Sequence, residues 1–193
     1  MAELYKSKAL LFGHEGVYSV NDPDDPGGET VFGVAREKWP DIGLWIVVDK
    51  IKTQNASKPK SFLIEEIEAS SEVRDEIDKF YRSQFWDKFG LDHQPQIVAD
   101  EIFEQSVNIG VSGCTKHIQK TCNILNRNGS LWEDTIVDGV FGKGTREVMD
   151  LCIKDSVYYF VSVMNLYQGA FYLELKKEKY IRGWSKRAIP ILK

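Results

Sequence analysis

Cysteine and long apolar segments are scarce in this sequence. Its 193 residues include only three cysteines, Cys114, Cys122 and Cys152, and none of them forms a C-x-x-C pair. An odd number rules out a complete disulfide framework, and the spacing gives no zinc-ribbon or redox motif. No apolar run reaches the ~20 residues that a membrane-spanning helix needs. We therefore expect three buried thiols, a reducing compartment for synthesis and no integral membrane segment.

The sequence also lacks an excess of basic residues. With 25 Lys and Arg against 29 Asp and Glu, the net charge is −4, so we expect no nucleic-acid partner. The charge is uneven, because residues 174–193 carry +5 and residues 1–173 carry −9. A basic end of this kind fits contact with an anionic polymer or a membrane surface, but we favour a solvated helix face that balances the acidic body. Near the N-terminus, the apolar run at residues 9–12 is too short for the core of a signal peptide, so we expect synthesis in the cytoplasm without one.

Glycine and proline, modest in number, gather at residues 21–28, which therefore cannot form a helix or a central strand. The β-branched residues 30–34 that follow predict a short strand. Apolar residues elsewhere recur at helical spacing. The predicted helices are an N-terminal one ending near residue 14, and others at residues 44–51, 71–90, 95–110, 113–126, 145 onward and 157–175. The composition, 42% hydrophobic and 28% charged, fits one soluble, mainly α domain over residues 1–193 with a small β element near 30–34.

Two expectations concern the C-terminal half. Thr145 follows the tight loop at residues 138–144 and is predicted to cap the helix behind it. Residues 157–175 are apolar almost all round the predicted helix, so we expect this helix to be central to the core. Residues 44–71 carry no recognisable functional motif.

The segment most suggestive of chemistry runs from His14 to Thr30. Glu15 stands at the end of a predicted helix beside a glycine, and Asp22, Asp24 and Asp25 follow on a rigid turn. Cleavage of a glycosidic bond needs a protonated carboxylic acid and a second, ionised group. A helix end packed on the core can raise the pKa of the acid, whereas a carboxylate on a polar loop stays ionised. The segment therefore fits a glycosidase site.

Other interpretations of this segment are weaker. The spacing of Asp22 and Asp24 is that of a calcium loop, but Gly33 stands at the twelfth position, where a bidentate glutamate is required. The pair His14-Glu15 lacks the second histidine of a zinc protease motif. Taken alone, the residues also fit helix capping and turn formation.

The full pattern resembles the glycoside hydrolase family 108 muramidases, which include phage endolysins and bacterial proteins described as secretion activators. The resemblance covers nearly the whole chain in the right order. It rests on His14-Glu-Gly-Val-Tyr18, Asn21-Asp-Pro-Asp-Asp-Pro-Gly-Gly-Glu-Thr30 with Phe32-Gly-Val34, the aromatic segment Phe80-Tyr-Arg-Ser-Gln-Phe-Trp86, Val98-Ala-Asp-Glu-Ile-Phe-Glu-Gln-Ser-Val-Asn-Ile-Gly110, and Asp138-Gly-Val-Phe-Gly-Lys-Gly-Thr145. One departure is Val17, where the family usually has glycine.

The resemblance implies a lysozyme-like helical fold and hydrolysis of the β-1,4 bond between N-acetylmuramic acid and N-acetylglucosamine. Residues 1–90 would form a catalytic part, and residues 91–193 a helical part similar to a predicted peptidoglycan-binding domain. The cleft would lie between the Glu15 region and the helices of residues 80–110. The partner would be peptidoglycan glycan strands, acted on at the bacterial cell wall, and neither a cofactor nor a metal is required.

Site residues follow from the same resemblance. Glu15 corresponds to the catalytic acid. The second carboxylate is Asp25 or, as second choice, Asp22. Thr30 lies fifteen residues after Glu15, and the lysozymes of some phages place a threonine that positions water at that interval.

Substrate-binding candidates lie further along the chain. Tyr18, Tyr81 and Trp86 are candidates for stacking on sugar rings, and Asn108 for bonding an N-acetyl group. Core packing is the alternative for Tyr81 and Trp86, and a polar helix end is the alternative for Asn108. Gln105 either supports the site or pairs with backbone, and the loop at residues 138–145 is either a ligand loop or purely structural.

The sequence leaves several points open. A non-catalytic wall-binding or secretion-apparatus protein of the same fold is the main alternative, and a module that binds another glycan such as chitin is a third. Export through a holin and export through a secretion system are both compatible with the residues. Inversion or retention depends on the distance between the carboxyl groups. The oligomeric state is not indicated.

Overall fold

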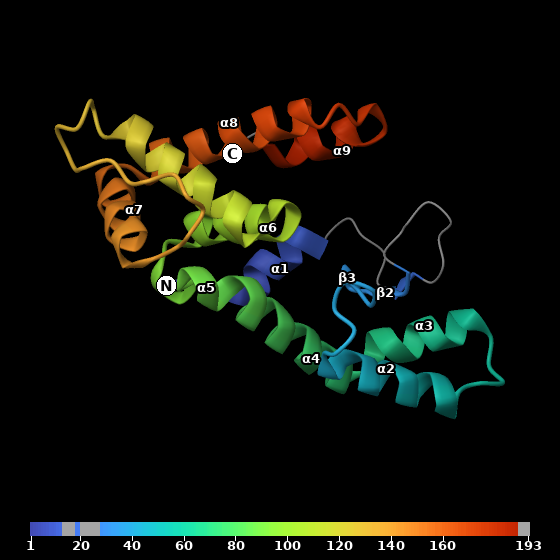
Figure 1. The fold of residues 1–193 in the computed structure, drawn as a ribbon. Helices are drawn as coiled ribbons and strands as arrows, with labels where there is room; N and C mark the ends of the chain where they lie inside the picture. The colour runs from blue at the N-terminus through green and yellow to red at the C-terminus, as the bar shows by residue number, and fades with distance from the viewer. Residues whose placement is uncertain (13–17, 20–27, 189–193) are drawn as a thin grey trace. The chain divides into compact units, whose positions relative to one another are not determined.

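A computed structural model describes residues 1–12, 18–19 and 28–188, and most of them are helical (Figure 1). The chain forms two compact units. The N-terminal unit is Lys8–Gln84, and the C-terminal unit combines Met1–Ser7 with Phe85–Lys193. Helix α1 (Leu4–Phe12) runs across this division. The expected mainly α fold with a small β element is confirmed.

The β element is a three-stranded antiparallel sheet in the order β1-β2-β3. Its strands are β1 (Tyr18–Ser19), β2 (Thr30–Val31) and β3 (Val34–Ala35). The turn between β2 and β3 has positive φ at both central residues, 46° at Phe32 and 77° at Gly33. Two-residue hairpins of type I′ require this backbone, and glycine adopts it without steric cost. The sequence Val-Phe-Gly-Val therefore folds back on itself and fixes the register.

Three helices complete the N-terminal unit: α2 (Gly43–Gln54), α3 (Lys60–Ala69) and α4 (Ser71–Tyr81). The side chain of Ser70 accepts a hydrogen bond from the Val73 backbone N–H at 3.3 Å and so caps α4. The helices pack on one another through buried aliphatic and aromatic side chains. These are Leu44, Trp45, Val48, Ile67, Val73 and Ile77. The predicted helix at 44–51 is confirmed, whereas α3 was not predicted.

The chain then continues through the π-helical turn η1 (Arg82–Trp86) and α5 (Asp87–Phe89), which ends at Gly90 with a left-handed backbone. After the short 3₁₀ turn η2 (Leu91–His93), α6 (Gln96–Leu125) is broken at Gly110, where φ is 80° and ψ is 158°. The breaks predicted at Gly90 and Gly110 are therefore confirmed. The remaining helices are α7 (Lys143–Asp155), α8 (Val157–Glu174) and α9 (Glu178–Ala188).

The core of the C-terminal unit is formed by buried side chains of α5 to α8. It includes the three cysteines, which are buried and not joined in disulfides, as expected. Its largest fully buried members are Trp86, Phe89, Phe103 and Phe160 together with Leu91, Ile102, Ile118, Met149 and Met164.

Two expectations for this unit are corrected. The N-cap of α7 is Gly142, and Thr145 lies inside the first turn, because its hydroxyl instead meets the buried Gln119 amide at 3.2 Å. Helix α8 buries only one side. Its apolar residues Leu166 and Leu173 are 72% and 69% exposed, because the neighbouring helices cover part of its circumference.

Candidate active site

The sheet joins the two halves of the predicted catalytic segment. Strand β1 pairs with β2 so that Tyr18 faces Val31 and Ser19 faces Thr30. Strand β1, which begins three residues after Glu15 in the sequence, and the strand that carries Thr30 therefore form one antiparallel ladder. Glu15, Asp22 and Asp25 themselves lie outside the described residues, as does the Tyr18 side chain.

Thr30 has an unusual polar environment. Its hydroxyl oxygen is buried, and no described residue provides it with a hydrogen-bond partner. A buried hydroxyl without a partner normally costs about 1–3 kcal/mol. The neighbouring Val31 is fully buried, and the hairpin fixes the backbone on both sides. Thr30 is therefore held firmly, and the hydrogen-bonding capacity of its buried hydroxyl is not used by the described residues.

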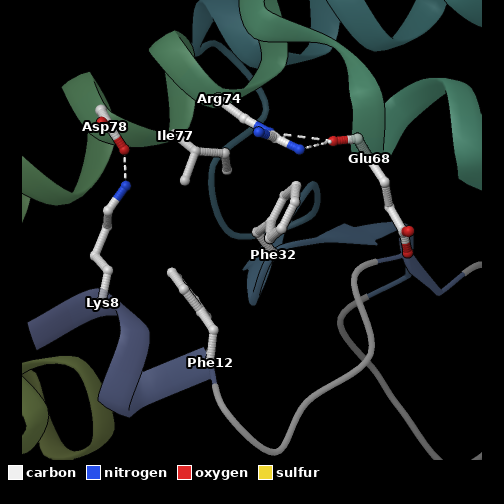
Figure 2. A pocket seen from close by; sticks show the side chains of 7 residues that line it. All are labelled: Lys8, Phe12, Phe32, Glu68, Arg74, Ile77 and Asp78. Carbon is white, nitrogen blue, oxygen red and sulfur yellow. Dashed lines mark hydrogen bonds and ion pairs between the residues drawn. The ribbon is translucent and has the colours of Figure 1, made fainter. Parts of the chain in front are cut away.

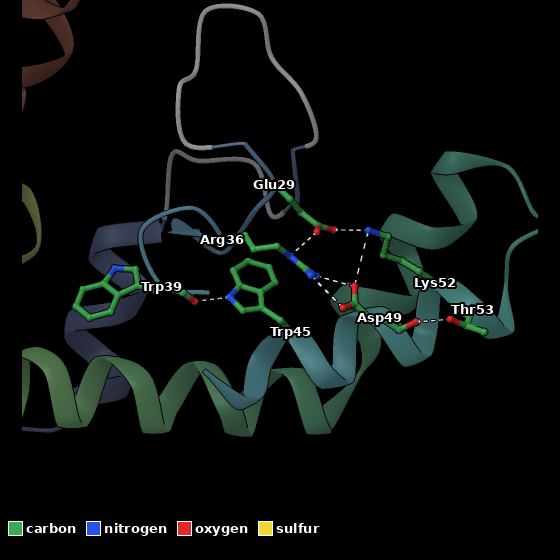
Figure 3. Close-up of polar contacts among 7 residues, drawn as sticks. All are labelled: Glu29, Arg36, Trp39, Trp45, Asp49, Lys52 and Thr53. Carbon is green, nitrogen blue, oxygen red and sulfur yellow. Dashed lines mark hydrogen bonds and ion pairs between the residues drawn. The ribbon is translucent and has the colours of Figure 1, made fainter. Parts of the chain in front are cut away.

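A cluster of charged side chains braces the hairpin that carries Thr30 (Figure 3). Glu29, only 10% exposed at its side chain, pairs with Arg36 at 2.8 Å and with Lys52 of α2 at 3.0 Å. Arg36 also donates two hydrogen bonds to Asp49 of α2, at 2.6 and 3.0 Å, which lowers the pKa of the Asp49 carboxyl. The backbone N–H of Arg36 donates to the Glu29 carbonyl at 2.8 Å. These contacts attach both ends of the hairpin to α2.

Aromatic residues complete this brace. The Arg36 guanidinium lies over the Trp45 ring, 4.6 Å from its centroid. The Trp45 indole N–H donates to the Trp39 carbonyl at 2.6 Å. Because Trp45 is 3% exposed, it anchors Arg36 to the core of the N-terminal unit. Sequence analysis missed this brace, since its charges are distant in the chain.

A pocket of about 360 Å³ opens in the N-terminal unit (Figure 2). Phe12, Phe32 and Ile77 form its apolar walls, and the two phenyl rings meet edge to face at 6.1 Å. Phe12 lies three residues before Glu15, and Phe32 two residues after Thr30. The pocket thus lies next to the hairpin that carries Thr30.

Charged side chains also line this pocket, and they come from three helices. Lys8 of α1 forms an ion pair with Asp78 of α4. Arg74 of α4 donates to the backbone carbonyl of Glu68 of α3, through Nε at 3.1 Å and Nη2 at 2.7 Å. The lysine is therefore neutralised by a carboxylate, whereas the arginine is held by a carbonyl.

Two of the predicted sugar-stacking residues lie in the core. Tyr81 is 2% exposed, and its hydroxyl donates to the Phe32 carbonyl at 2.8 Å. Trp86 is fully buried, and its indole N–H donates to Asp92 at 2.9 Å. Their rings have no face open to a sugar, which corresponds to the core-packing alternative. Tyr81 instead supports the hairpin turn after Thr30.

The polar candidates on α6 occupy different environments. Asn108 is exposed and donates to the backbone and side chain of Glu104, at 2.9 and 2.6 Å. Gln105 is fully buried and donates to Glu101 at 2.6 Å and to the Met164 carbonyl at 2.9 Å. Asn108 therefore lies on the surface of the C-terminal unit, bonded to Glu104, whereas Gln105 links α6 to α8.

Gln105 also connects two buried ionisable groups that sequence analysis missed. Its Oε1 lies 2.8 Å from His117 Nδ1, and Glu101 accepts a further bond from Asn165 at 2.6 Å. Burial raises the pKa of Glu101 to about 7, with Glu104 adding to the effect. Burial lowers the pKa of His117 to about 4, helped by the charge of Lys120. Polar residues at core positions of a helix give no periodic apolar signal, and the part of this network on α8, Asn165 and the Met164 carbonyl, is distant in the sequence.

The loop of residues 138–145 is held by internal bonds. Asp138 accepts from the Val140 backbone N–H and from the Gln119 side chain, both at 2.8 Å, and these bonds lower its pKa. Gly139 has φ of 79°, and its N–H donates to Gln119 at 2.9 Å. This arrangement corresponds to the structural alternative for the loop.

Neither a metal cluster nor a spanning helix is found in the parts of the chain that the structure describes. No three His, Cys, Asp or Glu side chains gather there in a way that could hold a metal ion. No helix among those residues has the length and apolarity needed to cross a membrane. Asp22 and Asp24 of the calcium-like spacing fall outside the described ranges.

Comparison with known proteins identifies the family. A family model described as Glycosyl hydrolase 108 matches residues 9–110, and one described as Predicted Peptidoglycan domain matches residues 116–189. The first match covers more than half of the chain, so the protein belongs to glycosyl hydrolase family 108, a lysozyme-like family of glycoside hydrolases.

A solved structure supports the fold. The chain is similar to SagA of Brucella abortus, with 20% sequence identity, a TM-score of 0.59, and coverage of 95% of this chain and 88% of that chain. At this identity the likeness shows that the two proteins share a fold. No curated protein matches the sequence.

Proposed function

We propose that this protein is an N-acetylmuramidase that hydrolyses the β-1,4 bond between N-acetylmuramic acid and N-acetylglucosamine in peptidoglycan. The family membership and the peptidoglycan-domain match make peptidoglycan the natural substrate class. The observation that supports the proposal is the pairing of Ser19 with Thr30, because Ser19 follows the predicted acid Glu15 by four residues in the sequence. A glycosidase needs a carboxylic acid close to the groups that position the attacking water.

In the proposed reaction, Glu15 is the general acid. It donates its proton to the bridging oxygen as the bond to the anomeric carbon breaks, and the leaving sugar departs as an alcohol. Asp25, or else Asp22, stabilises the positive charge that develops on the sugar ring or orients the attacking water. Desolvation at a helix end would raise the pKa of Glu15, so that it keeps its proton near neutral pH.

Thr30 is assigned the positioning of water. Its hydroxyl can accept one hydrogen bond and donate another, and the described residues use neither capacity. The Glu29–Arg36 brace keeps the strand in place without touching this hydroxyl. Tyr18, which precedes Ser19 in β1, would stack on a sugar ring, and Asn108 would form a hydrogen bond with an N-acetyl group.

The C-terminal part is proposed to retain the enzyme on the wall. The peptidoglycan-domain match covers the C-terminal end of α6 and all of α7, α8 and α9. Residues 1–90 would carry the chemistry, and residues 91–193 would bind glycan strands. Export through a holin or a secretion system would bring the protein to the wall.

The proposal is tested by comparing lysis by the wild type and two glutamate variants. Glu15→Gln removes the acid but keeps the shape, and Glu65→Gln makes the same change at an exposed position of α3. We expect the Glu15 variant to lose more than a hundredfold in the rate of sacculus solubilisation at an unchanged melting temperature, and the Glu65 variant to match the wild type. Full activity of Glu15→Gln would refute the proposal. Binding of sacculi by the wild type without any solubilisation would indicate the non-catalytic alternative.

A further inference from the structure

The pocket of the N-terminal unit contains two charges that its own side chains leave unpaired. Among the described residues, no carboxylate forms an ion pair with Arg74, and no cation forms one with Glu68. Figure 2 shows the Glu68 carboxylate pointing away from the guanidinium, although the Glu68 backbone carbonyl accepts both arginine bonds. The pocket therefore presents one cation and one anion, separated from each other.

Arg74 differs from Arg36 in the partners that hold its guanidinium. Arg36 is neutralised by Glu29 and Asp49. Arg74 is oriented through Nε and Nη2 by a neutral carbonyl, so its charge is fixed in position without being cancelled. A guanidinium held in this way has its remaining N–H donors available, and its planar fork matches a carboxylate.

The walls between these charges suit a short aliphatic body. Phe12, Phe32 and Ile77 provide apolar surface, and a volume of about 360 Å³ lies within the range of small-ligand sites. The neighbouring Lys8 is occupied by Asp78 and contributes little net charge. The pocket thus fits a ligand with a carboxylate, an ammonium group and an aliphatic chain between them.

We propose that this pocket is a subsite for the peptide branch of peptidoglycan. Arg74 would bind a free carboxylate of the branch, and Glu68 the ammonium group of its diamino acid. The inference rests on the proposed muramidase function, because a glycan strand bound at the hairpin that carries Thr30 would bring its peptide branch to the pocket that Phe32 of the same hairpin lines. It makes Arg74 and Glu68 determinants of specificity, since chitin carries neither group.

The experiment measures binding of soluble disaccharide-peptide fragments to the full chain by calorimetry. One fragment carries free carboxylates, a second carries the same carboxylates as amides, and a third has its amine acetylated. We expect the wild type to bind the free form about five- to tenfold more tightly than the amidated form, since charge-assisted bonds at an exposed site are modest. Arg74→Gln should abolish this preference.

Two further variants separate recognition from folding. Lys79→Gln removes an exposed charge of the same helix outside the pocket and should keep the preference. Glu68→Gln leaves the carbonyl that anchors Arg74 intact and should abolish the preference for the free amine over the acetylated form. Equal affinity of the wild type for all three fragments, or a preference that survives Arg74→Gln in a folded protein, would overturn the inference.

Sacculus digestion by the same preparations distinguishes the two proposals. Cleavage of glycan without any preference among the fragments would overturn the peptide subsite alone. A clear preference for the free carboxylate without cleavage of glycan would overturn the muramidase assignment and retain the subsite.

Discussion

Replacement of Thr30 by valine separates a functional hydroxyl from a structural one. The two side chains have nearly the same shape, and both suit a β-strand. Because the Thr30 hydroxyl is buried and has no partner among the described residues, its removal takes away no protein hydrogen bond. A hydroxyl left unsatisfied costs about 1–3 kcal/mol, so the free energy of unfolding should stay equal or rise by about 1 kcal/mol.

The activity should move in the opposite direction. If the hydroxyl orients the attacking water, Thr30→Val should lower kcat on sacculi about ten- to a hundredfold, which corresponds to roughly 1.4–2.7 kcal/mol of activation free energy. Thr121→Val is a matched control, because the Thr121 hydroxyl on α6 is also buried and without a partner among the described residues. It should have the same small effect on stability and none on kcat.

Two measurements test this reasoning. Urea denaturation gives the free energy of unfolding, and release of soluble fragments gives the rate. A loss of more than about 1 kcal/mol in Thr30→Val but not in Thr121→Val would show that the Thr30 hydroxyl holds the fold. An unchanged rate would show that it takes no part in the reaction.

Further predictions concern the C-terminal polar core and the charged brace. The pKa of Glu101, raised to about 7, makes the fold more stable below pH 4.5 and less stable as the pH rises through 7, whereas the pKa of His117, lowered to about 4, makes it less stable as the pH falls from 6.5 through 4. These two pH dependences oppose each other. On acidification, the free energy of unfolding should therefore fall in Glu101→Gln, which keeps only the His117 effect, and rise in His117→Asn, which keeps only the Glu101 effect. The change should be on the order of 3 kcal/mol for Glu101 and less for His117. Urea denaturation at several pH values checks this, and parallel curves of stability against pH for the two variants would contradict it. Arg36→Met should cost about 2 kcal/mol of unfolding free energy, because it removes the ion pair with Glu29, two hydrogen bonds to Asp49 and the contact with the Trp45 ring. Lys52→Met should cost about 0.5 kcal/mol, because Glu29 keeps its pair with Arg36 and only the lysine contacts are lost. Equal losses in chemical denaturation would contradict the larger set of contacts assigned to Arg36.

Local chemistry explains what could be predicted about the fold. The predicted breaks at Gly90 and Gly110 follow from backbone conformations that glycine adopts readily. Residues 30–34 were predicted as one short strand, but they form two strands joined by a turn at Phe32 and Gly33. The helical spacing of apolar residues identified α2 and α4, because each of these helices buries one face. Helix α3 was missed because its apolar residues directly follow a polar loop, and only Ile67 of them is fully buried.

Contacts distant in sequence explain what could not be predicted. Thr145 has the residue type of an N-cap, but Gln119 of α6 draws its hydroxyl into the core. Trp86 has the residue type of a sugar platform, but Asp92 and Phe103 enclose its ring. For the candidate site, the sequence indicated Thr30, whereas the brace from α2 and the charges of Arg74 required the three-dimensional arrangement.

The most direct test of the muramidase assignment is the identity of the new reducing end. Purified sacculi are digested with the wild type and with Glu15→Gln, the products are reduced with borohydride, and the terminal sugar alcohol is identified by mass spectrometry. We predict reduced N-acetylmuramic acid at the ends released by the wild type and none released by the variant. Ends carrying reduced N-acetylglucosamine, free peptides without new sugar ends, or equal release by the variant would contradict the account.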